Sequence, residues 1–169
     1  SRYVEFCDEN MQTHSIEFAH LLLAASSEVD VVAKLLCQRL EPAAPRSNID
    51  EYRKVLAGSP MGLQAMRVFV PRYGLELTPW SNWASATNPA WWRSHNNVKH
   101  ERNEFFREAT LKNALNAMAA LLTVVFQYYR FTMQGAVSPL DPKETTQQLQ
   151  PESSLMQLPD DHYYSVRIC

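Results

Sequence analysis

Glycine is scarce in this sequence. Only four glycines occur among its 169 residues, so the chain holds no glycine-rich loop of the kind that cradles nucleotide phosphates with backbone N–H groups. The Gly-x-Ser-x-Gly motif, which presents the nucleophile of many hydrolases on a sharp turn, is also missing. These absences argue against a P-loop nucleotide site and against an α/β-hydrolase site.

Cysteine is equally sparse. Cys7, Cys37 and Cys169 form no Cys-x-x-Cys pair, and an odd number of widely spaced thiols indicates neither a disulfide framework nor a zinc site. His14 and His20 have no third ligand at a suitable spacing, so we predict no metal and no cofactor. A reducing compartment fits this cysteine usage, and we expect no signal peptide. We therefore expect a cytoplasmic protein.

An excess of charge and a membrane-spanning run are lacking too. The formal net charge of −2 creates no general positive field, so any nucleic acid would have to bind a local cluster of Lys and Arg. The longest apolar run, residues 117–129, contains Thr123 and Gln127 and is shorter than the ~20 residues that span a bilayer. It predicts a buried core helix and no membrane partner.

The clearest pattern present is a helical period over residues 15–41. Apolar side chains recur there at steps of three and four and mark one face of an amphipathic helix: Phe18, Leu22, Ala25, Val29, Val32, Leu36 and Leu40. Glu41-Pro42 ends the pattern, because the residue before a proline avoids helical geometry. Cys37 falls on an apolar face, so we expect a buried thiol.

A second long helix is predicted over residues 104–131. Its apolar side chains alternate by four and three: Leu111, Leu115, Met118, Leu122, Val125 and Tyr129. Gly135 and Pro139 close this helix. We predict that the two long helices pack antiparallel through their leucine-rich faces, with Leu22 and Leu122 buried.

Shorter elements lie between the two helices. Asn48, three residues before Glu51, predicts a capping box that opens a short helix. Residues 66–78 indicate a small β-hairpin or extended excursion, which a cluster of aromatic side chains would pin onto the helices: Trp80, Trp83, Trp91 and Trp92. Asn88-Pro89 predicts a further helix start with Asn as the N-cap. A break near residues 100–103 is expected, because an unbroken helix from Pro89 would be unusually long.

These elements predict an all-α fold, a helical bundle of two long amphipathic helices plus shorter helices, with a small β-hairpin around residues 66–78. A chain of this length forms one domain, which we place at residues 1–137. Residues 138–169 are rich in Pro and Gln and predict a C-terminal tail that wraps the surface or is partly disordered.

Residues 91–103 concentrate polar and basic side chains beside aromatic ones. On a helix, positions i, i+3, i+4 and i+7 form a single stripe, and here they hold Arg93, Asn96, Asn97 and His100. A histidine exchanges protons near neutral pH, an arginine stabilises charge on a phosphoryl group, and an asparagine can hold a ribose or phosphate oxygen. The same residues could instead form a polar helix terminus that caps the backbone and satisfies its neighbours.

This stripe resembles a known signature. Arg93, six residues and then His100 is similar to the Arg-x(4–6)-His motif of the HEPN superfamily, small helical domains found in RNA-cleaving toxins, antiviral effectors and nucleotidyltransferase partners. The Asn-x-x-Lys-His form of residues 96–100 looks like a variant in bacterial HEPN-like proteins of unknown function. The resemblance spans roughly residues 15–131 and places the whole predicted domain, residues 1–137, in this class.

The resemblance implies a metal-independent ribonuclease acting as a toxin or phage-defence effector. A ribose 2′-hydroxyl would attack the adjacent phosphate, with His100 assisting proton transfer and Arg93 stabilising the transition state. The residues implied to bind the substrate are Asn96, Asn97, Lys99 and Arg102. It also implies a homodimer that builds the active cleft across two copies, with RNA as the partner.

A second hypothesis is a catalytically inactive helical module that binds a protein partner or a nucleotide. Ser94 follows Arg93, whereas active HEPN-like proteins commonly place Asn, Asp or His there. This departure and the net negative charge favour the inactive module, while the stripe with its neighbours Lys99 and Arg102 favours the ribonuclease.

Glu28 is a further candidate, in a supporting role. It falls on a stripe with Leu21, Ala24, Val31 and Leu35, and a half-buried carboxylate generally needs a cationic or hydrogen-bonding partner. We therefore predict that Glu28 lies within salt-bridge reach of the basic motif. The alternative is a structural ion pair without a functional role.

Overall fold

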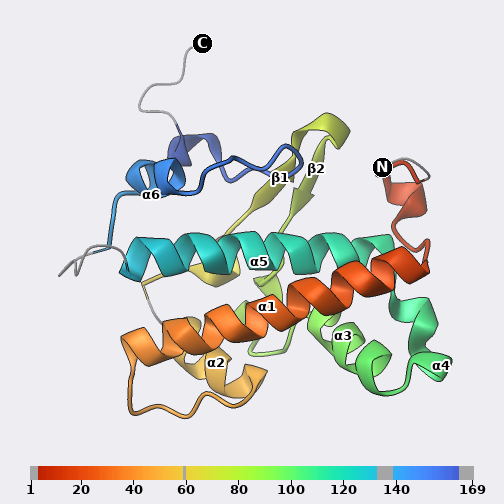
Figure 1. Cartoon of the computed structure of the whole chain (residues 1–169), viewed down its shortest axis with the longest axis horizontal. Coiled ribbons are helices and arrows are strands. Elements are labelled where there is room, and N and C mark those ends of the chain that lie inside the picture. The colour runs from red at the N-terminus through yellow and green to blue at the C-terminus, as the bar shows by residue number, and fades with distance from the viewer. Residues whose placement is uncertain (1–3, 59, 133–138, 164–169) are drawn as a thin grey trace.

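Two long helices, α1 (Ile16–Leu40) and α5 (Leu111–Thr132), lie side by side through the centre of the molecule (Figure 1). The computed structural model describes residues 4–58, 60–132 and 139–163. On one side of the pair lie α2 (Ile49–Leu56), α3 (Ala90–His100) and the short α4 (Arg102–Phe105). On the other side lie the strands β1 (Val68–Val70) and β2 (Leu75–Leu77) and the C-terminal helix α6 (Pro142–Gln148). The chain is thus mostly helical with one small hairpin, as predicted.

The predicted end of α1 before Glu41-Pro42 and the predicted cap of α2 by Asn48 are confirmed, although Glu51 accepts from the N–H of Ser47 and not from that of Asn48. Ser15 is the N-cap of α1, and its Oγ accepts a hydrogen bond from the backbone N–H of Phe18 at 3.1 Å. Asn48 caps α2, its Oδ1 accepting from the N–H groups of Asp50 and Glu51 at 3.1 Å each. These bonds satisfy donors that the first turn of a helix leaves without a partner.

The relative direction of α1 and α5 corrects our prediction, because the two helices run parallel (Figure 1). Their starts are joined: the N–H of Ser15 donates to the carbonyl of Ala109 at 3.4 Å, and the N–H of Leu111 donates to the carbonyl of Thr13 at 2.9 Å. Short connections make consecutive helices antiparallel. Residues 41–110 separate these two helices, and so long a connection returns the chain to the end from which α1 began.

The contact between α1 and α5 also differs from the leucine-to-leucine packing we predicted. The cluster that holds α1 takes small side chains from α5, namely Ala117, Ala120 and Val124. Leu111 and Leu115 of α5 are buried in a second cluster, against the hairpin and the C-terminal segment. Small residues at a helix contact let the two axes approach closely, so the alanine face of α5 meets α1 and the leucine face is left for the hairpin.

The start of α5 corrects a further boundary. The predicted second helix began at residue 104, whereas residues 102–108 form α4 and a short 3-10 turn, and α5 begins at Leu111. The break expected near residues 100–103 is confirmed: α3 ends at His100, and Glu101 has φ −137° and ψ 52°. Cys37 is buried as expected, and burial raises the pKa of its thiol to about 11.

The predicted hairpin is present and is anchored by tryptophans. Strands β1 and β2 pair antiparallel, with Val68 opposite Leu77, and Gly74 adopts φ +63° in the turn between them. Trp80 donates from its indole Nε1–H to Thr123 Oγ1 of α5 at 2.9 Å. Trp91 at the start of α3 donates to the carbonyl of Pro79 at 2.8 Å. The aromatic cluster therefore attaches the excursion to two helices, as expected.

The described part of the C-terminal tail wraps over α5. After α6 the chain passes beside β1, where Phe69 and Gln157 exchange two backbone hydrogen bonds of 2.8 and 2.9 Å. Met156 and Leu158 are buried in the cluster that holds the leucine face of α5. Residues 133–138 and 164–169 of the predicted tail lie outside the described residues. No helix in the described part of the chain is long and apolar enough to span a membrane.

Candidate functional site

Helix α3 carries the predicted polar stripe. The helix is continuous from Ala90 to His100, so the side chains of Arg93, Asn96, Asn97 and His100 share one face. Arg93, Asn96 and His100 are exposed and Asn97 is half-buried, while Trp91 and Val98 on the other side of the helix are buried in the core. The expected break near residues 100–103 follows directly, at Glu101.

The first residue of α3 differs slightly from the prediction. Pro89 precedes the first helical residue, and the Asn88 side chain does not cap the helix. Instead, Asn88 Oδ1 accepts from Arg53 Nη1 at 2.9 Å, and its Nδ2 donates to Asp50 Oδ1 at 3.2 Å. Asp50 and Arg53 form an ion pair on α2. Hydrogen bonds to charged groups are stronger than those to neutral backbone groups, so the Asn88 side chain binds this pair and leaves the start of α3 uncapped.

A polar cleft of about 450 Å³ opens along the first two turns of α3. Its lining is made of Ala90, Arg93, Ser94, Asn96, Asn97, Glu108 and Asn113. Three of the predicted site residues, Arg93, Asn96 and Asn97, are therefore brought together. His100 is not part of this lining: it stands one helical turn beyond Asn96 and Asn97, at the end of α3.

Hydrogen bonds fix the wall of the cleft opposite α3. Asn97 Nδ2 donates to both carboxylate oxygens of Glu108 at 3.1 Å each. Asn113, in the first turn of α5, donates from Nδ2 to Ser94 Oγ at 3.0 Å and to the carbonyl of Glu108 at 2.8 Å. These hydrogen bonds join α3, the 3-10 turn and α5 to one another. The side chains that make them also line the cleft.

Glu108 and Asn113 are residues of the cleft that the sequence pattern did not single out. Neither belongs to the α3 stripe, and only the turn after His100 folds them back onto it. A partial signal was present at Thr110, whose Oγ1 accepts from the N–H of Asn113 at 3.2 Å. Threonine is a preferred N-cap residue, and its hydroxyl accepts from the N–H of the residue three positions later. Thr110 therefore indicates a helix start that places Asn113 in the first turn of α5.

The basic side chains of the motif have no hydrogen-bond or ion-pair partner among the described residues. Arg93, Lys99, His100 and Arg102 are exposed, and none of them hydrogen-bonds or ion-pairs with another residue in the described part of the chain. Arg53 and Arg67, in contrast, form ion pairs with Asp50 and Glu76. Unpaired cations at a polar cleft can bind an external anion without first breaking an internal contact.

His95 lies on the buried side of α3 and has a different character. Only 4% of it is exposed, its ring packs 5.3 Å from the Trp92 ring, and neither ring nitrogen has a hydrogen-bond partner among the described residues. Burial, reinforced by the charges of Lys99 and His100, lowers the pKa of His95 to about 4. The imidazole is therefore neutral at pH 7 and is shielded from the cleft, so it is no candidate for catalysis there.

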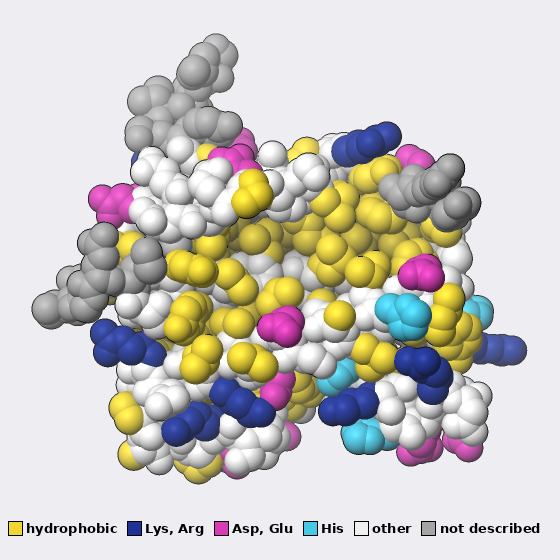
Figure 2. Space-filling model, viewed as in Figure 1, with side chains coloured by type: hydrophobic (Ala, Val, Ile, Leu, Met, Phe, Trp, Pro, Cys, Tyr) yellow, Lys and Arg dark blue, Asp and Glu magenta, His cyan; other side chains and the backbone are white. Residues whose placement is uncertain are grey.

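The prediction for Glu28 is wrong. Glu28 is exposed on α1 and forms no ion pair within the described residues. The stripe that carries it faces solvent, where Ile16, Leu21, Val31 and Leu35 are between 42% and 50% exposed. Helix α1 has two apolar stripes, and the one through Leu22 and Leu36 occupies the core. Figure 2 shows hydrophobic side chains along the outer face of α1.

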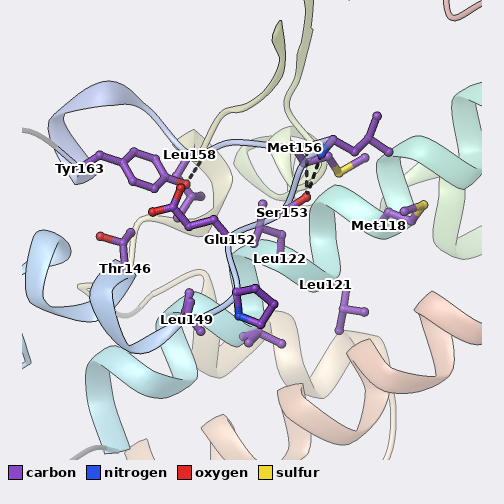
Figure 3. A pocket seen from close by; sticks show the side chains of 13 residues that line it. Met118, Leu121, Leu122, Thr146, Leu149, Glu152, Ser153, Met156, Leu158 and Tyr163 are labelled. Atoms are coloured by element: carbon purple, nitrogen blue, oxygen red, sulfur yellow. Dashed lines mark hydrogen bonds between the residues drawn. The ribbon is translucent and has the colours of Figure 1, made fainter. Parts of the chain in front are cut away.

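A second hollow, of about 350 Å³, lies between α5 and the C-terminal segment (Figure 3). Its walls are mostly apolar and include Leu121 and Leu122 of α5 and Leu149 and Met156 of the tail. Ser153 Oγ is engaged, because it accepts from the N–H groups of Leu155 and Met156. The lining of this hollow contains no Lys or Arg, whereas Arg93 lines the cleft on α3. Leu122 is half-buried here, short of the full burial we predicted.

The fold and the cleft together define a helical domain with an amide-lined, partly cationic surface site. The chain matches no protein-family model, and neither a curated protein nor a solved structure is significantly similar to it. Across residues 4–58, 60–132 and 139–163, no three His, Cys, Asp or Glu side chains are grouped so that they could hold a metal ion.

Proposed function

We propose that this chain is a HEPN-like RNA-binding domain that cleaves RNA without a metal. One observation carries the proposal: Arg93, Asn96, Asn97 and His100 share one face of α3, and the first three of them line a polar cleft. Arg93 and His100 have no hydrogen-bond or ion-pair partner among the described residues, which suits binding of a phosphodiester. The similarity of the motif to the HEPN signature supports the same reading.

The chemistry follows from the two ends of the stripe. His100 would accept the proton of a ribose 2′-hydroxyl, whose oxygen attacks the adjacent phosphorus and expels the 5′-oxygen of the next nucleotide. Products would be a 2′,3′-cyclic phosphate and a 5′-hydroxyl, which takes its proton from water. Arg93 would hold the phosphate oxygens as negative charge grows on them. Seven residues of helix separate the two Cα atoms by about 10.5 Å, so both long side chains must lean towards one phosphate.

The remaining predicted residues would guide the RNA. Lys99 and Arg102 flank His100 and are exposed, so they can contact the backbone phosphates on either side of the cut. Asn96 is exposed at the cleft and can hold a ribose hydroxyl. A role as a toxin or phage-defence effector is part of the proposal and rests on the resemblance alone.

We further propose that the active form is a homodimer joined through the outer face of α1. The face is apolar over Leu21, Val31 and Leu35, with Glu17 in the first turn of the helix and Arg39 in the last. An antiparallel second copy would set the acidic start of one α1 against the basic end of the other. Such a two-fold contact uses the same surface on both copies and closes on itself.

The decisive experiment is cleavage of RNA by the purified chain in the presence of EDTA. We expect His100→Ala to slow cleavage by at least ~100-fold, the usual contribution of a general base, and Arg93→Ala to do likewise. The matched control is His14→Ala, which removes an exposed histidine that lies outside α3 and before the start of α1. RNA cleavage that persists unchanged in His100→Ala would contradict the proposal.

The second candidate function is an inactive module that binds a nucleotide or a protein. Two observations favour it: His100 is outside the lining of the cleft, and Ser94 is engaged by Asn113. In that case the wild-type chain would bind RNA or a nucleotide in the cleft and leave RNA intact. Electrophoresis of the RNA after incubation, together with a binding titration, separates the two functions.

A further inference from the structure

The cleft on α3 contains one carboxylate, Glu108, in a fixed orientation. Asn97 Nδ2 donates to both of its oxygens at 3.1 Å, and Glu108 is half-buried. A carboxylate has about four acceptor positions, so after these bonds each oxygen can still accept another hydrogen. The side chain therefore presents a pair of adjacent acceptors to whatever enters the cleft.

Hydrogen-bond donors stand on the other side of the same space. Ser94 Oγ accepts from Asn113 at 3.0 Å, which leaves the proton of its hydroxyl available to donate. The Asn96 amide is exposed and has no partner among the described residues. The cleft thus combines two adjacent acceptors on Glu108 with neutral donors on α3, and a volume of about 450 Å³ is within the ~300–1,000 Å³ of small-molecule sites.

Among the four RNA bases, guanine matches this arrangement. Its Watson–Crick edge carries two adjacent donors, N1–H and the N2 amino group, which can both bind one carboxylate, and beside them the acceptor O6. Adenine and cytosine each place an acceptor nitrogen next to their amino group, and uracil has a single N–H between two carbonyls. Each of those bases would place an acceptor against the acceptor oxygens of Glu108. Polar groups left without a hydrogen bond in a binding site lower the affinity strongly.

We infer that the cleft binds a guanine base, with Glu108 accepting from N1–H and N2–H and with Ser94 or Asn96 donating to O6. The inference rests on the proposed function for its consequence in RNA: the cut falls beside a guanosine. Asn96 and His100 are four residues apart on α3, about 6 Å along the axis. A guanosine whose base fills the cleft would therefore direct its ribose and phosphate towards His100 and the cations of the motif.

The first test measures binding without chemistry. GMP, AMP, CMP and UMP are titrated into the ¹⁵N-labelled wild-type chain, and the side-chain amide signals of Asn96, Asn97 and Asn113 are followed by NMR. We expect GMP to shift these signals and to bind at least ~10-fold more tightly than the other three, since hydrogen bonds to a charged group discriminate by that much or more. IMP, which lacks the N2 amino group, should fall between GMP and AMP. Equal binding of all four nucleotides, or none, would overturn the inference.

The second test changes the carboxylate. Glu108→Gln keeps the shape of the side chain and one acceptor for Asn97, but replaces the other acceptor with a donor, so we expect GMP to bind ~10-fold less tightly. Glu104→Gln is the matched control, because it makes the same charge change at a nearby exposed position outside the cleft. A circular dichroism melt of each variant checks folding. If GMP binds Glu108→Gln as tightly as the wild type, the assignment of Glu108 is wrong.

RNA cleavage by the wild-type chain separates failure of this inference from failure of the proposed function. Cleavage that depends on His100 but falls equally beside all four bases would overturn the guanine pocket and leave the ribonuclease standing. Selective GMP binding with intact RNA would support the pocket and contradict the ribonuclease.

Discussion

Trp80 and Thr123 form a hydrogen bond that is fully buried between the hairpin excursion and α5, with the indole Nε1–H donating to Oγ1 at 2.9 Å. The hydroxyl of Thr123 in turn donates a hydrogen bond to the carbonyl of Ala120 at 2.8 Å. We expect Thr123→Val, which has the same shape, to lower the free energy of unfolding by about 1–3 kcal/mol, because the indole N–H is left without an acceptor. Urea denaturation measures this. Thr78→Val, at an exposed position, should change stability by less than ~0.5 kcal/mol.

Leu22 and Leu122 should differ in their importance for stability. Leu22 is fully buried between α1 and its neighbours, and truncation to Ala should lower the unfolding free energy by about 2–5 kcal/mol. Leu122 is half-buried beside the apolar hollow, so it loses fewer contacts on truncation and should have a clearly smaller effect. Equal losses in urea denaturation would show that the hollow is closed in solution.

His95 should make the protein less stable in acid. The pKa of His95 is lowered from an unfolded value near 6.5 to about 4 in the fold, so between these pH values the unfolded chain binds a proton that the folded chain does not. Stability therefore falls as the pH drops from about 6.5 to 4, by up to roughly 3 kcal/mol from this group. The negative charge of Asp30 raises the pKa of His95 and so opposes part of this shift. Chemical denaturation at several pH values should show a flatter profile for His95→Phe, and an unchanged profile would contradict this assignment.

The outer face of α1 should control self-association. Leu21→Lys places a charge in the apolar stripe and should shift the chain towards monomer, while Glu28→Leu removes the carboxylate that lies on this stripe and should strengthen the dimer. Light scattering coupled to size exclusion measures both. Lys54→Glu is a suitable control on an exposed position of α2. Identical masses for Leu21→Lys, Glu28→Leu and the wild type would place the interface elsewhere.

Local signals in the sequence predicted the elements well. Asn48 and Pro42 mark helix ends through hydrogen bonds and backbone geometry that involve only near neighbours in the chain, and each acts as expected. The hairpin around Gly74 follows for the same reason. Such features depend on residues within a few positions, so a single sequence contains them in full.

Relations between distant segments were harder to predict. The period of α1 allows two apolar faces, and which of them enters the core depends on the shape of α5, so Glu28 was placed on the wrong side. The parallel direction of α1 and α5 depends on the path of the long connection between them. Glu108 and Asn113 enter the cleft only because the chain turns back after His100, and no periodicity in the sequence encodes that meeting.

The bond pair between Phe69 and Gln157 has a consequence for the hairpin itself. A two-stranded sheet has two open edges, and an open edge can pair with a strand of another molecule. Gln157 occupies the outer edge of β1 at its central residue, and the flanking Met156 and Leu158 are buried beneath it. The C-terminal segment thus acts as a guard against aggregation: a chain cut before Leu155 would expose a short apolar edge strand and become prone to intermolecular β-pairing.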